Sequence, residues 1–114
     1  MRIEIKGRNG VTVSEELRAR VEKKFAKVAR QVSPLANLEL ELKEERNPSI
    51  HDSQVAEATL YLKGVTLRAR ERSDDMGHSI NLVAEDLHRQ VKRHRDKRRR
   101  RRESAKAQPR TAPS

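Results

Sequence analysis

Cationic side chains gathered in one stretch are the residues of this sequence most able to do chemistry. Between His88 and Arg102 there are ten Lys or Arg residues and one acid, Asp96, which gives a net charge of +9. Residues 1–87 hold fifteen bases and fifteen acids, so their net charge is zero. Guanidinium and ammonium groups at this density bind phosphate with little dependence on base sequence. The pattern predicts a neutral body with one cationic extension that meets a nucleic acid.

Side chains that could catalyse a reaction or hold a metal ion are not grouped in the sequence. None of the four histidines lies three or four residues from another, the spacing that places two imidazoles on one helix face. Glu85 and Asp86 are adjacent, so on a helix they point about 100° apart and cannot act together on one atom. Cysteine is absent, and there is no phosphate-binding glycine loop or nucleophile elbow. We therefore expect no enzyme activity, no cofactor, no metal and no small-molecule substrate.

Aromatic residues are too few for a nucleic-acid module that stacks bases. The chain has one Tyr, one Phe and no Trp, whereas RNA-recognition sheets and single-strand-binding grooves need several aromatic rings. The remaining mode is recognition of phosphates and RNA shape by Lys and Arg on helices. No run approaches the ~20 apolar residues of a membrane span, and the basic stretch lacks an apolar face for a membrane surface. We expect a soluble, cytoplasmic protein that binds no membrane.

The elements that position these cations begin with a strand and a helix. Residues 1–6 alternate apolar and polar side chains, as in a strand with one buried face. Turn residues follow at 7–10, and Ser14 or Thr12 can cap a helix that ends at Ser33-Pro34. The apolar stripe of this helix is formed by Leu17, Val21, Phe25, Val28 and Val32.

Three further strands are predicted between residues 38 and 72. Leu38, Leu40 and Leu42 alternate with charged residues, and residues 44–49 break the strand with a loop that runs through Asp52. The next two strands also alternate and flank a tight turn at Gly64, so they form a hairpin.

The basic stretch belongs to a final helix that starts near Asp74. Asp74 or Asp75 caps it, where an acid also suits the helix dipole. Its apolar stripe is formed by Met76, Ile80, Val83, Ala84, Leu87 and Val91. Because each strand alternates and each helix has one stripe, we predict an α+β fold. It is a two-layer β-α-β-β-β-α sandwich, with a four-stranded sheet and both helices on one face. We assign one domain to residues 1–98 and a basic run with a disordered tail or linker to 99–114.

One flank of the first helix is also basic. Arg20, Lys24 and Lys27 lie together on it at helical spacing. Such a flank fits either a solvated face, with Lys stems lying over the edge of the core, or a phosphate-binding ridge. A second basic helix beside it favours the ridge.

Three segments resemble the ribosome hibernation-promoting factors, also called ribosome-associated inhibitors or small-subunit-interface proteins. They are residues 7–24, the hairpin at 58–69 and, most specifically, residues 75–97, with Ser79-Ile80-Asn81 and Arg93-His94-Arg95. The resemblance covers about residues 1–98 and implies the β-α-β-β-β-α fold, in agreement with the prediction from periodicity.

The resemblance implies a factor that binds the small ribosomal subunit between head and body. Messenger RNA and the A- and P-site transfer RNAs would lie there, so such a factor inhibits translation under stress or in stationary phase. The contacts implied by position are Lys23, Lys24, Lys27, Arg30, Arg89, Lys92, Arg93, Arg95 and Lys97. The charge pattern adds Arg20, Arg98, Arg99 and Arg100 to the predicted rRNA-binding set. We expect residues 1–98 to be the ribosome-binding domain and the chain to be monomeric off the ribosome.

Three features depart from the family pattern. The loop before the first helix is one residue longer, through Gly10. Gly77 stands where the family usually has an aromatic residue, and the arginine run from Arg98 to Arg102 is longer than the family requires. A long form of the family adds a C-terminal domain that dimerises ribosomes, so this chain is interpreted as a short form or a truncated long form. The alternative function is a general RNA-coating protein whose arginine run binds any polyanion.

Overall fold

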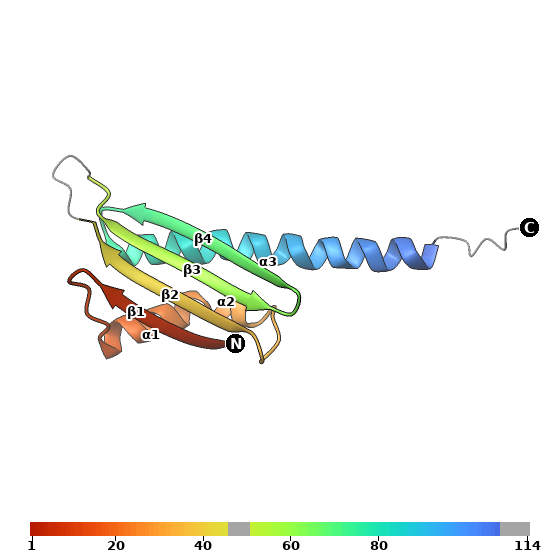
Figure 1. Cartoon of the computed structure of the whole chain (residues 1–114), viewed down its shortest axis with the longest axis horizontal. Helices are drawn as coiled ribbons and strands as arrows, with labels where there is room; N and C mark the ends of the chain where they lie inside the picture. Colours follow the sequence, from red (N-terminus) through yellow and green to blue (C-terminus); the bar gives the residue numbers. More distant parts are fainter. Residues whose placement is uncertain (46–50, 108–114) are drawn as a thin grey trace, which may run out of the picture.

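The computed structural model describes residues 1–45 and 51–107, with side chains as far as Glu103. It contains a four-stranded sheet, two consecutive helices and one long helix (Figure 1). In chain order the elements are β1 (Arg2–Arg8), α1 (Glu15–Lys24), α2 (Ala26–Ala29), β2 (Asn37–Glu44), β3 (Gln54–Leu62), β4 (Val65–Ser73) and α3 (Met76–Ala107). The predicted order of strands and helices is confirmed, with the first helix divided in two. The centre of the loop predicted between β2 and β3 lies outside the described residues.

The sheet has the strand order β1-β2-β3-β4. β1 pairs with β2 in parallel, whereas the other two pairs are antiparallel. A parallel pair needs a crossover, and α1 and α2 supply it. Figure 1 shows α1, α2 and α3 behind the same face of the sheet. The fold is therefore the predicted α+β sandwich of two layers.

One alternating row of side chains on the sheet faces the helices and forms the core. The strand register places Ile5, Leu40, Ala58 and Ala69 side by side across all four strands. Leu40 and Ala58 are each 1% exposed. The helices complete the core with Val21, Phe25, Val28, Ile80, Val83, Ala84, Leu87 and Val91. The small alanines of β3 and β4 leave room for α3 to approach those strands.

The first helix is less regular than the sequence predicted. Ser14 caps α1, because its hydroxyl oxygen accepts a hydrogen bond of 3.1 Å from the Leu17 N–H. The prediction of one helix reaching Ser33-Pro34 was wrong. Phe25 adopts φ −90° and ψ 5°, outside the helical region, and separates α1 from α2. At the end, the Gln31 N–H donates to the Val28 carbonyl oxygen (3.0 Å), a tightened last turn that precedes the proline.

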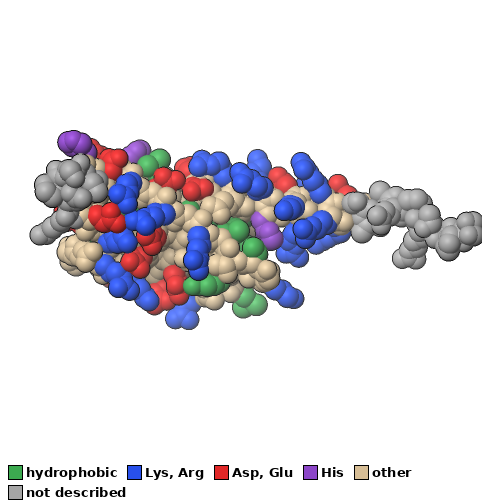
Figure 2. Space-filling view, turned by 45° about the horizontal axis from the view of Figure 1, so that its top comes forward, with side chains coloured by type: hydrophobic (Ala, Val, Ile, Leu, Met, Phe, Trp, Pro, Cys, Tyr) green, Lys and Arg blue, Asp and Glu red, His purple; other side chains and the backbone are tan. Residues whose placement is uncertain are grey.

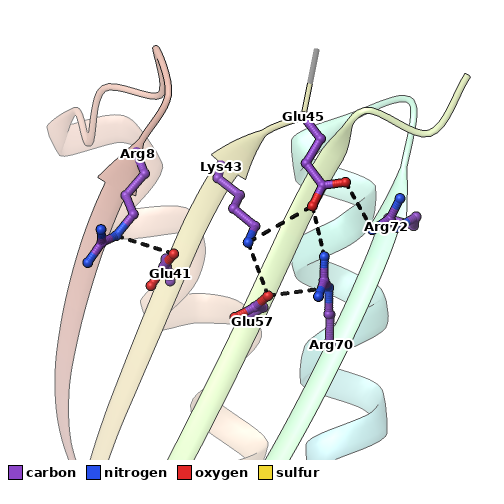
Figure 3. Close-up of polar contacts among 7 residues, drawn as sticks. All are labelled: Arg8, Glu41, Lys43, Glu45, Glu57, Arg70 and Arg72. Carbon is purple, nitrogen blue, oxygen red and sulfur yellow. Dashed lines mark hydrogen bonds and ion pairs between the residues drawn. The ribbon is translucent and has the colours of Figure 1, made fainter. Parts of the chain in front are cut away.

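The outer face of the sheet carries a cluster of ion pairs (Figure 3). Its members are Lys43, Glu45, Glu57, Arg70 and Arg72. Glu45 lies 2.8 Å from Arg70 Nη2 and 3.1 Å from Arg72 Nη2. Lys43 and Arg72 flank Val55 in the strand register, and Val55 is 0% exposed although it faces away from the helices. Partly exposed pairs contribute little energy singly, but here their stems remove an apolar side chain from water.

The long helix α3 starts at a defined cap. Of the two candidate caps, Asp75 is the one used, since its Oδ2 accepts a hydrogen bond of 2.9 Å from the His78 N–H. Ser79 on the first turn is fully buried, and its hydroxyl donates to the Gln54 carbonyl oxygen (2.6 Å). The first bond caps α3, and the second attaches its first turn to the beginning of β3.

The far half of α3 projects beyond the sheet (Figure 1). The helix has 32 residues, and at 1.5 Å per residue its length is about 48 Å. Val91 is the last buried residue among the described side chains of α3. The expectation of a disordered tail from Glu103 onward was wrong for residues 103–107, which continue the helix. Ala and Lys are strong helix formers, a helix already nucleated extends at little cost, and Arg99 pairs with Glu103 at 3.7 Å. Residues 108–114 lie outside the described part.

We predict that two substitutions on the same side of α3 will differ strongly in their effect on stability. Leu87 and Arg98 are eleven residues apart, so they lie within about 20° of the same helix line. Leu87→Ala should lower the free energy of unfolding by about 2–5 kcal/mol, because the side chain is fully buried. Arg98→Ala should change it by less than about 0.5 kcal/mol, since the residue is exposed beyond the sheet. Urea unfolding measures both, and a large loss with Arg98→Ala would show that the extension packs on the body.

Candidate nucleic-acid interface

The first helix and α3 lie side by side and run in the same direction (Figure 1). Two contacts define this arrangement. The Arg20 guanidinium lies over Gly77, and Lys27 Nζ lies 4.0 Å from Glu85 Oε1. The two contacts are seven residues apart in the α1–α2 segment and eight residues apart in α3. The two segments therefore run alongside each other across the sheet. Their outward sides therefore form one continuous surface on the side of the molecule opposite the outer face of the sheet.

Basic residues dominate that continuous surface, which we call the basic roof. Its cations are Lys23, Lys24, Lys27, Arg30, Arg89, Lys92, Arg93 and Lys97, all of them exposed. Lys27 is the one roof cation with an ion pair among the described contacts. Its side chain and that of Glu85 are 64% and 56% exposed, so the pair contributes little and leaves Lys27 available to a ligand. By contrast, Arg70 and Arg72 on the outer face are held in the ion-pair cluster.

The predicted site residues of α3 fall into two groups. Arg89, Lys92, Arg93, Lys97 and Arg100 surround a shallow hollow together with Asp96. Arg95, Arg98 and Arg99 surround a second hollow together with Arg102. The first group continues the basic roof. The second lies on another side of the helix, so the structure does not bring all thirteen predicted residues onto one surface. Arg102 was missing from the predicted set, although it belongs to the same arginine run.

Arg20 has a different environment from the roof cations. A Cβ placed on Gly77 would lie 2.5 Å from Arg20 Cζ and 2.6 Å from both terminal nitrogens. The missing side chain at this position therefore makes room for the guanidinium against the first turn of α3. This explains how the chain accommodates glycine where an aromatic residue was expected from the family pattern. Arg20 joins the two helices here, and it lies at the edge of the basic roof.

Three polar side chains at the helices were not among the predicted site residues. Gln31 Oε1, Asn81 Oδ1 and His88 Nδ1 are buried and have no hydrogen-bond partner among the described atoms. Asn81 and His88 are seven residues apart, so they lie on the same flank of α3. Periodicity could have revealed them, because two polar residues at this spacing adjoin the apolar stripe.

Metal sites and membrane-spanning helices are both absent from the part of the chain that the structure describes. Within residues 1–45 and 51–107, no three His, Cys, Asp or Glu side chains come close enough to hold a metal ion. No described helix is both long enough and apolar enough to cross a bilayer.

The structure is thus a two-layer α+β sandwich whose helices carry exposed cations on one continuous surface. Residues 3–99 match the family model described as Sigma 54 modulation protein / S30EA ribosomal protein. This chain therefore belongs to that family, and the family predicted from the resemblance is confirmed.

Two curated relatives are both named ribosome hibernation promotion factor. The one from Picosynechococcus sp. is 32% identical over 98 residues, which cover 85% of this chain and 50% of the relative. The one from Staphylococcus aureus is 34% identical over 95 residues, which cover 83% of this chain and 48% of the relative. The chain thus spans about half the length of these relatives.

Two solved structures have the same fold. A ribosomal subunit interface protein from Coxiella burnetii superposes with a TM-score of 0.66 at 26% identity. That match covers 84% of this chain and 99% of the other. The N-terminal domain of Protein Y from Thermus thermophilus superposes with a TM-score of 0.70, also at 26% identity. It covers 82% of this chain and 99% of the other, so the shared part is nearly the whole of each relative's solved chain.

We predict that Gly77 and Arg20 are energetically coupled. Gly77→Ala should stabilise an Arg20→Ala background by up to about 1 kcal/mol, because alanine favours a helix over glycine. In the wild-type background the gain should be smaller, since the new methyl group must displace the guanidinium. A double-mutant cycle from thermal or urea unfolding measures the difference. Equal gains in both backgrounds would show that the Arg20 guanidinium does not lie against Gly77.

Proposed function

We propose that this chain is a ribosome hibernation factor that acts in the cytoplasm. Its basic roof binds RNA of the small ribosomal subunit in the channel used by messenger RNA and by the A- and P-site transfer RNAs. By occupying that channel it inhibits translation under stress or in stationary phase. It acts by binding alone, without catalysis, and as a monomer when off the ribosome.

The observation that carries this proposal is the continuous basic roof on a body with no net charge. The two parallel helices hold their cations at fixed spacing, so several phosphates of a folded RNA can be bound at once. Each such contact releases counterions from the RNA, which favours association most at low salt. Since base-stacking aromatic rings are scarce, the roof recognises shape and phosphate positions rather than a base sequence.

Family membership supports the ribosome as the partner. The curated relatives carry the name ribosome hibernation promotion factor, and one solved neighbour is described as a ribosomal subunit interface protein. The family match ends at residue 99, close to the last roof residue, Lys97. We therefore propose residues 1–98 as the ribosome-binding domain. The thirteen predicted residues from Arg20 to Arg100 are the proposed rRNA contacts. Eleven of them lie in this domain, and Arg99 and Arg100 follow it in the basic run.

A second function is favoured by the cationic extension of α3. The run Arg98–Arg102 projects past the body and is exposed, as expected for a protein that coats any RNA. Such a protein would bind large and small subunits alike and would not compete with transfer RNA for one place.

We predict that saturating protein will prevent initiator transfer RNA from binding to purified small subunits. The reason is that both ligands would need the same RNA surface. Filter binding with labelled transfer RNA measures the exclusion, and sedimentation with separated subunits measures which subunit holds the protein. Large subunits serve as the matched control, because they offer a comparable density of phosphates. Unchanged transfer RNA binding, together with equal protein on both subunits, would favour the coating function instead.

A further inference from the structure

The helix α3 changes character where it leaves the sheet. Over the sheet it is one-sided, with Ile80, Leu87 and Val91 buried and Arg89 and Arg93 exposed on the opposite side. Beyond Val91 none of the described side chains of α3 is buried. The distal segment, residues 95–103, therefore has no face committed to the protein core. Any ligand that this segment meets can approach it from more than one side.

Cations occupy opposite sides of the distal segment. Lys97 and Arg100 lie within about 80° of Arg89 around the helix and so continue the basic roof. Arg98 and Arg102 lie within about 60° of the line of Leu87, which faces the sheet about three to four turns earlier. The hollow lined by Arg89, Arg100 and their neighbours is distinct from that lined by Arg98 and Arg102. Figure 2 shows Lys and Arg side chains both above and below this part of the helix.

The charge of the distal segment is poorly compensated within the protein. Residues 95–103 contain seven bases and two acids, a net charge of +5. The ion pairs described in the segment are Arg95 with Asp96 at 3.9 Å and Arg99 with Glu103 at 3.7 Å. Crowded like charges repel one another on a helix, and phosphates bound on each charged side would relieve that repulsion. A flat RNA surface would neutralise one side and leave Arg98 and Arg102 on the other.

This segment also extends past what the family shares. The family match ends at residue 99, whereas α3 continues to Ala107. Both solved relatives are covered almost completely by about five-sixths of this chain. Of the two underside cations, Arg98 therefore lies inside the family match and Arg102 lies beyond it.

We propose that the distal segment of α3 inserts between two phosphate backbones of folded RNA. Lys97 and Arg100 bind the backbone that the roof already follows, and Arg98 and Arg102 bind a second backbone on the underside. An α-helix with side chains is about 10–12 Å wide, so it fits a cleft between two RNA segments and presents cations to both walls. The inference rests on the proposed function and deepens it, since it specifies a two-walled RNA site and not a flat one.

Two charge-matched variants of the full chain test this proposal. Lys97→Gln with Arg100→Gln removes two cations from the roof side, and Arg98→Gln with Arg102→Gln removes two from the underside. None of the four has an ion pair among the described contacts. Glutamine also keeps the helix propensity close to that of Lys and Arg. Circular dichroism should therefore show the same helix content in both variants and in the wild type.

Binding to purified small subunits is measured at several salt concentrations, with hydroxyl-radical footprinting of the RNA. Each pair should weaken binding roughly tenfold, because an exposed ion contact contributes up to about fivefold. Each should lower the salt slope by about 1.5, the value for two phosphate contacts. The two variants should lose protection at different RNA segments, which is the signature of two walls.

Three other outcomes are informative. Wild-type affinity, slope and footprint in the underside variant would overturn the two-walled site and leave the proposed function standing. Equal weakening with no local change in either footprint would also overturn it, because long-range attraction alone then explains the effect. If the wild-type chain failed to bind small subunits at all, both the proposed function and this inference would fall.

Discussion

Packing of the apolar stripe of α3 on β3 and β4 is the interaction on which the rest of this structure depends. The stripe includes Ile80, Leu87 and Val91. It lies against the part of the sheet where the small side chains of Ala58 and Ala69 leave room for the helix. Once these side chains are buried, the rotation of the helix is fixed, and Arg89 and Arg93 must point away from the sheet. The capping bond at Asp75 fixes the residue at which α3 begins. The length of α3 then determines how far the helix projects beyond the sheet. Burial of this one apolar stripe thus determines which way the cations of α3 face.

Charged side chains are arranged differently on the two faces of the molecule: they are largely paired on the outer face of the sheet and mostly unpaired on the described helical face. On the outer face of the sheet, Arg70 and Arg72 are held by Glu45 and Glu57, and the stems around them cover Val55. On the helical face the cations are mostly unpaired and spaced along two parallel helices. Ion pairs between exposed groups add little to stability, so an unpaired cation costs the fold little. The sequence can therefore place free cations on one side and reserve them for an external polyanion.

Local patterns predicted most of the fold, and features that depend on several elements together escaped them. Ser14, the alternating leucines of β2 and the stripe of α3 are each visible within a few residues, and the structure confirmed them. The helix break at Phe25 is not marked by a Gly or Pro in the sequence. The burial of Val55 depends on Lys43 and Arg72, which are distant in sequence. The division of the α3 cations into two groups was also missed, because it requires knowing where the sheet ends. The family was recognised most specifically from the spacing of residues 75–97. The contact of Arg20 with Gly77 joins two separate helices, so the sequence alone did not reveal it. The individual RNA contacts remain proposals.

The claim at the centre of this account is that RNA meets the basic roof and not the outer face of the sheet. Comparing two triple variants tests it most directly, since each removes three cations that are exposed. One replaces Lys24, Lys27 and Arg93 with Gln on the roof, and the other replaces Arg2, Lys6 and Arg68 with Gln on the outer face. The salt dependence of binding to small subunits is then measured for both. The account predicts that the roof variant loses about 2 to 3 units of salt slope while the outer-face variant matches the wild type. The opposite pattern would contradict it.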